Sequence, residues 1–183
     1  MDDDKLIMII RHAEKPLPDK PDLGINEIGQ EDDKSLTVRG WQRAGALARL
    51  FYAPPTPLQI PKTIVASAAI KKDGSGSRSL RPIQTITPLA QRLHIDPDIR
   101  HSKGQESMAG DNIAGQTSPV LVCWQHESIP DLAAAIVGSS ETAPNAWDDG
   151  DYASVWILSF SEIRRQWSFA LAQQRLLPGD EIA

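Results

Sequence analysis

The chain has 183 residues, of which 40% are hydrophobic and 23% charged, and its formal net charge is −5. This length suits one domain with a substantial core, which we expect over residues 1–183. The acidic balance argues against a nucleic-acid partner, because such a partner needs a basic surface that replaces phosphate counterions. A few arginines can still form a local pocket for a small anion.

The sequence contains one cysteine, Cys123, inside an apolar run over residues 120–124. A single cysteine excludes an internal disulfide and any multi-cysteine metal site, so we expect a buried structural thiol. The first five residues are acidic, whereas a secretory signal would begin with a basic segment. The apolar run that follows them is too short to span a bilayer. We therefore expect a cytoplasmic protein with no membrane partner.

The first half of the chain alternates strand and helix patterns. Residues 6–10 form a short, continuous apolar run, which is typical of a buried parallel strand. The polar stretch from residue 11 to about 36 is long enough to predict a functional loop or lid. Thr37 can cap a helix that extends to about residue 51 with its apolar side chains on one face. Residues 63–67 indicate a second buried strand.

The second half continues the alternation after a flexible loop over residues 71–77. Arg81-Pro82 begins a helix, because proline is favoured in the first turn. A polar segment then leads to the remaining expected elements: a strand over 120–124, a helix over 129–137, a strand over 152–160 and an edge strand over about 167–171. Alternating strands and helices predict an α/β fold.

Residues that could do chemistry follow the expected strands. Arg11-His12 comes after the first strand, Ser67 closes the second and His126 follows the third. Ligands of open α/β sheets bind at these carboxyl ends, and Arg81 begins a helix whose N-terminus favours anions. The planar fork of arginine matches phosphate oxygens, and a neutral histidine can attack phosphorus. The sequence therefore predicts a site for a phosphoryl group.

Arg11-His12-Ala13-Glu14 resembles the signature of the histidine phosphatase superfamily, which includes the cofactor-dependent phosphoglycerate mutases. Further motifs of that superfamily have counterparts in the same order: Leu36-Thr37 with Gly40, Arg43-Ala44 and Leu47-Ala48; then Ser67; then Arg81 with Gln84-Thr85; then residues 120–122 leading to His126. The resemblance spans about residues 6–137. It implies a three-layer α/β/α sandwich with a mainly parallel sheet.

The resemblance also implies roles for particular residues. His12 would be the nucleophile and form a phosphohistidine, while Arg11, Arg81 and His126 would bind the phosphoryl group. Water would then release phosphate. No metal or cofactor is implied, because fixed positive charge stabilises the phosphoryl oxygens. The substrate would be a small phosphorylated molecule or a phosphoprotein.

The sequence departs from the family pattern at two places. Residues 68–80 form an insertion that contains Arg78, a rival for the role of Arg81, although the Gln84-Thr85 spacing favours Arg81. The residue after His126 is Glu127, which we expect as a tentative proton donor because a second branch of the superfamily carries an acid there. Glu14 and Glu106 are the other candidates for the general acid.

Other readings of the same residues stay open. A mutase-type phosphotransferase would need further contacts to a phosphorylated acid, and we find no extra arginine cluster for them. A non-catalytic domain that binds a phosphorylated ligand would need only the arginines, so the intact His12 counts against it. A metallohydrolase would use His12, Glu14, His126 and Glu127 as ligands.

Overall fold

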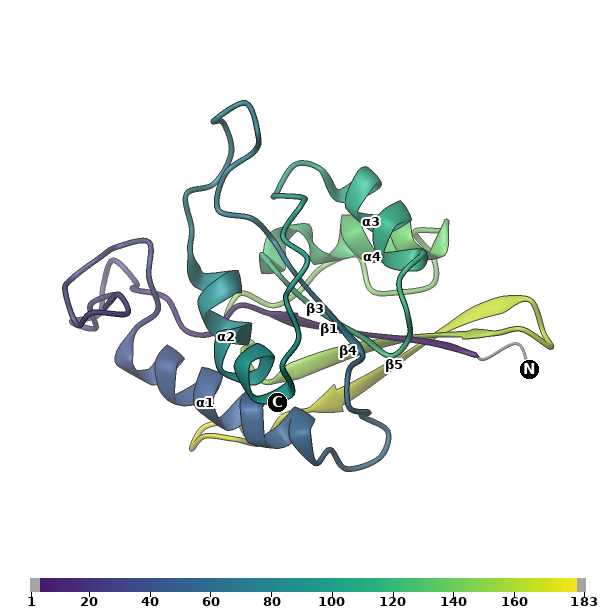
Figure 1. Cartoon of the computed structure of the whole chain (residues 1–183), viewed down its shortest axis with the longest axis horizontal. Helices are drawn as coiled ribbons and strands as arrows, with labels where there is room; N and C mark the ends of the chain where they lie inside the picture. Colours follow the sequence, from purple (N-terminus) through teal and green to yellow (C-terminus); the bar gives the residue numbers. More distant parts are fainter. Residues whose placement is uncertain (1–3, 181–183) are drawn as a thin grey trace.

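The structure, a computed structural model, describes residues 4–180. Its centre is a five-stranded sheet with the strand order β2-β3-β1-β4-β5, and helices cover both faces (Figure 1). The strands are β1 (Lys5–Arg11), β2 (Thr63–Ala66), β3 (Val120–Trp124), β4 (Ser154–Ser161) and β5 (Gln166–Gln173). The helices are α1 (Val38–Tyr52), α2 (Arg81–Leu93), α3 (Glu106–Ala114), α4 (Ile129–Val137) and a 3₁₀ turn, η1 (His126–Ser128).

The expected α/β fold is confirmed, but the sheet is mixed. Strands β2, β3 and β1 run parallel, whereas β4 pairs antiparallel with β1 and β5 pairs antiparallel with β4. The sheet is therefore less parallel than expected, because β4 and β5 form a hairpin, and a hairpin needs only a short connection. The carboxyl ends of the three parallel strands still meet at one edge, as a site there requires.

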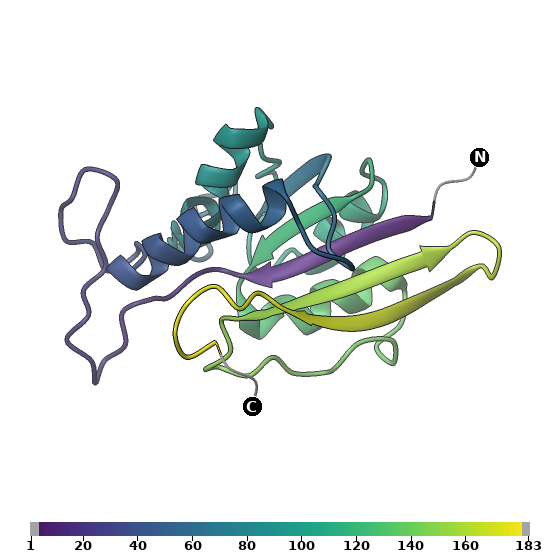
Figure 2. The same cartoon turned by 90° about the horizontal axis from the view of Figure 1, so that it is seen from below.

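Two cores sit on opposite faces of the sheet because neighbouring side chains of a strand point to opposite sides. Ile7 and Ile9 of β1 pack with residues of α3 and α4, whereas Met8 and Ile10 pack with α1 and α2. Figure 2 shows α1 and α2 on one side of the sheet and the green helices on the other. The three expected layers are thus present, and β1 is buried from Ile7 to Arg11.

Helix α3 was not expected, since it falls in a segment that reads as polar. Three residues of this helix are buried, and two of them are small: Ala109, Gly110 and Ile113. A Cβ on Gly110 would lie 2.5 Å from the Cβ of Ala135 in α4, so the two helices approach too closely for any side chain there. Close packing of small residues, rather than an apolar stripe, holds α3 in place. Cys123 is buried and free, as expected.

The long stretch between β1 and α1 is held against α1 by hydrogen bonds. Thr37 caps this helix by accepting a hydrogen bond from Gly40 N, and Trp41 Nε1 donates to Ile25 O at 2.7 Å. The backbone N of Thr37 also donates to Glu14 O at 3.0 Å, so the end of the stretch returns to the chain just after β1. None of the helices within residues 4–180 is long and apolar enough to cross a membrane.

Candidate active site

His12 lies immediately after β1, and its backbone N donates to Trp124 O at 3.0 Å, which continues the pairing with β3. Its ring is 3% exposed. Nδ1 lies 2.7 Å from Ala13 O. Because a carbonyl only accepts, Nδ1 carries the proton and Nε2 keeps its lone pair. Burial, together with the charges of Arg11 and Arg81, lowers the pKa of His12 to about 3. The ring is therefore neutral at pH 7 with a free nucleophilic nitrogen.

Arg11, the last residue of β1, is buried and reaches in two directions. Its Nη1 donates to the carbonyl oxygens of Asp148, Asp149 and Asp151 at 3.4, 2.7 and 3.3 Å. Its Nη2 lies 3.2 Å from His126 Nδ1, and the guanidinium covers the ring of Tyr152 at 3.8 Å. Nε is buried without a hydrogen-bond partner among residues 4–180. Arg11 thus connects the end of β1 to a loop over residues 148–152.

His126 is the second histidine of the site, and its ring centroid lies 6.4 Å from that of His12. Its Nε2 lies 2.7 Å from Asp149 Oδ1, and its Nδ1 lies 3.0 Å from Glu127 Oε2. Because a carboxylate only accepts hydrogen bonds, Nε2 is the donor in the contact with Asp149. The structure therefore brings together the two histidines that the strand ends predicted.

Arg81 is the first residue of α2 and is fixed by backbone carbonyls. Its Nε donates to Ser35 O at 3.2 Å, and its Nη2 donates to Asp33 O. Its charge is among those that lower the pKa of His12. Thr85, one turn later, accepts a hydrogen bond from Ala13 N at 2.9 Å and donates to Arg81 O at 2.7 Å. This spacing joins α2, which begins at Arg81, to the backbone beside His12.

Two of the three acids named as proton donors have other contacts. Glu14 accepts two hydrogen bonds from Arg43 Nε, at 3.1 and 3.0 Å, and one from Nη2 at 2.8 Å. Glu106 Oε1 accepts from Gly104 N at 2.9 Å and from Trp124 Nε1 at 3.1 Å. These contacts engage both carboxyl groups as hydrogen-bond acceptors. They argue against both residues as proton donors.

Glu127 is held as a carboxylate. The hydrogen bond with His126 and the ion pair with Lys103 hold the pKa of Glu127 well below its usual range, even though burial opposes this shift. A carboxyl group that stays ionised has no proton to donate. The geometry therefore argues against the donor role expected for Glu127 and favours a role as a counterion of the site.

Sequence reasoning missed Lys103 and Asp149. The backbone N of Lys103 donates to Ser67 Oγ at 3.2 Å, so Ser67 supports the loop that carries this lysine. Both residues lie in polar segments without a periodic pattern. The one available signal for Asp149 was the acidic run Asp148-Asp149-Gly150-Asp151 before a strand. Such runs are usually solvated, so the signal did not identify a site residue.

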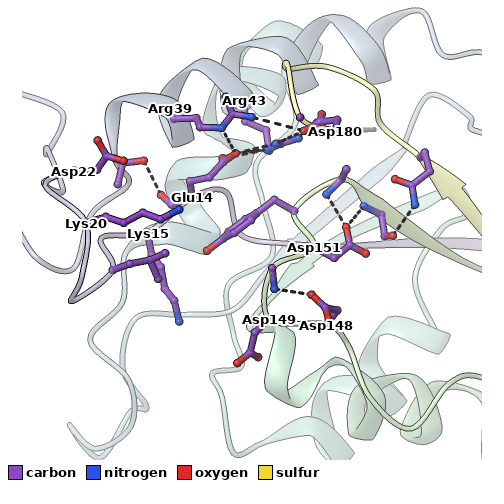
Figure 3. Close-up of a pocket in the computed structure, with 18 of the residues that line it drawn as sticks. Glu14, Lys15, Lys20, Asp22, Arg39, Arg43, Asp148, Asp149, Asp151 and Asp180 are labelled. Carbon is purple, nitrogen blue, oxygen red and sulfur yellow. Dashed lines mark hydrogen bonds and ion pairs between the residues drawn. The ribbon is translucent and has the colours of Figure 1, made fainter. Parts of the chain in front are cut away.

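A cavity of about 730 Å³ opens next to Asp149, although its lining includes neither of the two histidines and neither Arg11 nor Arg81. Glu14, Thr37, Asp149 and Tyr152 are among the residues that line it. Figure 3 shows Lys15, Lys20 and Asp22 on one side of the cavity, with Asp148, Asp149 and Asp151 on another. Asp149 therefore belongs both to the cavity and to the contacts of His126.

The sequence matches no protein-family model and no curated protein. The structure, however, is similar to solved structures of histidine phosphatases, so the chain has the fold of that superfamily.

One similar structure is described as a phosphohistidine phosphatase, SixA, from Nakamurella multipartitia. It matches with a TM-score of 0.53 and 15% identity over 93% of this chain and 96% of that one. Another is a mycobacterial glucosyl-3-phosphoglycerate phosphatase, solved with VO3. It has a TM-score of 0.51 and 14% identity over 91% of this chain and 97% of that one. Identities this low establish the fold, and the roles of individual residues have to be argued from the site itself.

Proposed function

We propose that the chain is a phosphomonoester hydrolase that works through a phosphohistidine on His12. One observation carries this proposal: His12 is buried and neutral, with Nδ1 bound to Ala13 O and with no hydrogen bond to Nε2 from residues 4–180. A neutral imidazole nitrogen is a nucleophile that can form a covalent intermediate. His12 Nε2 attacks the phosphorus, the bond to the leaving group breaks, and water then transfers the phosphoryl group to solvent as phosphate.

Arg11, Arg81 and His126 bind the phosphoryl oxygens in this proposal. All three contribute positive charge or N–H donors around His12, and such preorganised charge stabilises a phosphoryl transition state without a metal ion. Glu127 lies near the same cations, since its charge opposes the lowering of the pKa of both Arg11 and Arg81. Glu127 therefore acts as the counterion that an incoming phosphoryl group displaces.

Hydrolysis is favoured over a mutase reaction by the exposure of the site. A mutase has to retain its phosphohistidine and keep water away from it. The side chain of Asp149, which contacts His126, is 94% exposed. His126 and His12 are themselves buried, so solvent meets the site at Asp149, and the water that attacks the phosphohistidine enters beside this residue.

The substrate class is a phosphorylated small molecule or a phosphoprotein. The two similar structures carry names of enzymes that remove phosphate, one from phosphohistidine and one from a phosphorylated sugar acid. These names support phosphate removal as the reaction of this chain, and we expect it to take place in the cytoplasm.

The proposal is tested by a screen of the purified protein against a panel of phosphorylated metabolites and phosphopeptides, with phosphate release as the readout. His12→Asn should abolish turnover of every active substrate while the folded state persists. The matched control is His94→Asn, because His94 is exposed at the C-terminus of α2 and asparagine tolerates its left-handed backbone conformation. A His12→Asn variant with wild-type turnover would refute the mechanism.

A further inference from the structure

We propose that Asp149 is the acid–base residue of this site, which protonates the leaving group and then deprotonates the attacking water. This inference rests on the proposed phosphohistidine mechanism. It assigns the proton transfer to a loop outside the motifs that the sequence contains.

The argument begins with the other carboxylates around His12. Glu14 is bound by Arg43, Glu106 by Trp124 Nε1 and a backbone N–H, and Glu127 by His126 and Lys103. Each of these carboxyl groups is held by at least two contacts. Asp149 differs, because its contact is one hydrogen bond from His126 Nε2, a donor that a substrate phosphoryl oxygen can also accept from.

The loop over residues 148–152 is built to present this one carboxylate. Arg11 Nη1 binds three of its carbonyl oxygens. Asp148 Oδ1 accepts from Gly150 N at 2.7 Å, and Asp151 Oδ1 accepts from Ala153 N and Ser154 N at 2.9 Å. Two of the three aspartates therefore hold the shape of the loop, and the third, Asp149, faces the histidine.

Asp149 also lies where a proton donor has to lie. It contacts His126 on one side and lines the cavity of about 730 Å³ on the other. In this proposal the phosphoryl group lies among Arg11, Arg81 and His126, and the leaving group extends past Asp149 toward the cavity that this residue lines. Its 94% exposure lets it exchange protons with solvent between turnovers.

The proton balance of the two half-reactions is as follows. A bound phosphoryl dianion takes the hydrogen bond from His126, and Asp149 enters the reaction as the carboxylic acid. As His12 Nε2 bonds to phosphorus, the P–O bond breaks, the electron pair passes to the leaving oxygen, and Asp149 gives that oxygen its proton. The Asp149 carboxylate then takes a proton from water as the water oxygen attacks phosphorus. The P–N bond breaks, its electron pair returns to His12 Nε2, and phosphate leaves.

The test separates a proton donor from a structural residue by the basicity of the leaving group. Formation of the phosphoenzyme is followed by rapid quench with p-nitrophenyl phosphate, whose leaving group needs no proton, and with β-glycerophosphate, whose alkoxide does. Asp149→Asn should slow the step with β-glycerophosphate by about 10²- to 10⁴-fold and leave the p-nitrophenol burst nearly unchanged. Asp111→Asn, at an exposed position of α3 outside the cavity, is the matched control and should leave both rates at wild-type values.

The outcomes distinguish the two proposals. An equal loss with both substrates would assign Asp149 to positioning His126 and would overturn the acid–base role, as would no loss with either. The same two rates are measured for Asp149→Ala, so that an effect of the asparagine side chain itself can be recognised. A thermal melt checks the fold of each variant. A wild-type protein that forms no phosphoenzyme with either substrate would overturn the proposed function itself, and the acid–base role with it.

Discussion

Glu14 and Arg43 form a buried ion pair in which Arg43 Nη2 lies 2.8 Å from Glu14 Oε1. Arg43 Nη2 also lies 2.7 Å from Asp180 Oδ1, so one guanidinium joins the segment after β1 to the end of the described chain. These hydrogen bonds raise the pKa of Arg43 although burial alone would lower it. The fourth residue of the first motif therefore serves the structure around His12.

Replacement of Arg43 by methionine should destabilise the protein strongly. The change leaves the carboxylates of Glu14 and Asp180 without their buried partner, and breaking a buried ion pair in this way costs about 3–5 kcal/mol. The free energy of unfolding, measured by urea denaturation, should fall by that amount. Arg49→Met, at an exposed position of the same helix, should change it by less than about 1 kcal/mol. Equal effects of the two changes would contradict the account of Glu14.

Arg81→Lys should lower kcat more than it raises KM, whereas Arg78→Lys should change neither by much. Lysine keeps the charge but loses the fork that binds two phosphoryl oxygens. A charge-assisted hydrogen bond is worth about 1.5–3 kcal/mol, so we expect a roughly tenfold to hundredfold loss in kcat. Steady-state kinetics with one aryl phosphate measures both variants. A damaging Arg78→Lys would show that the insertion over residues 68–80 has been placed wrongly.

The first motif, the strand ends and the start of α2 could be predicted from sequence because each depends on local pattern. An apolar run marks β1, and a proline at the first turn marks the helix that begins at Arg81. The structure places His12, Arg11 and His126 together for the same reason, since parallel strands end at one edge of the sheet. Their catalytic roles remain proposals.

The rest depended on contacts between distant segments. Helix α3 packs through Gly110 against Ala135, and nothing in its own sequence reveals that partner. Asp149 reaches His126 because Arg11, more than a hundred residues earlier, binds the carbonyl oxygens of its loop. Glu127 was expected as a donor from its position after His126, but the ion pair with Lys103 depends on a loop that sequence reading leaves unassigned.

The stability of the protein should depend on pH through His12. The native ring stays neutral down to a pKa of about 3, whereas the unfolded ring takes up a proton below its ordinary value of 6.5. Its contribution is therefore complete above pH 6.5 and is lost as the pH falls toward 3, with a slope of about 1.4 kcal/mol per pH unit. Urea denaturation at several pH values should show that His12→Asn is shallower than wild type by up to this slope. Identical slopes would mean that the ring titrates alike in the two states.

Glu127→Gln should strengthen the binding of inorganic phosphate. The pKa of Glu127 lies well below its usual range, so its charge is present at neutral pH and opposes an anion among the same cations. Removal of one like charge at short range should lower the inhibition constant of phosphate roughly fivefold. Glu141→Gln, at an exposed position outside the site, should leave it unchanged. Weaker phosphate binding in the Glu127 variant would show that this carboxylate supports the site instead of neutralising it.

The most direct test of the central claim is to identify the covalent intermediate. Wild-type protein is mixed with p-nitrophenyl phosphate in the presence of a strong chelator, quenched in base and digested, and the peptides are analysed by mass spectrometry. The account predicts one additional phosphoryl group, labile to acid, on the peptide that carries His12, and none in the His12→Asn variant. Turnover without any phosphorylated His12, or phosphorylation at another residue, would contradict it.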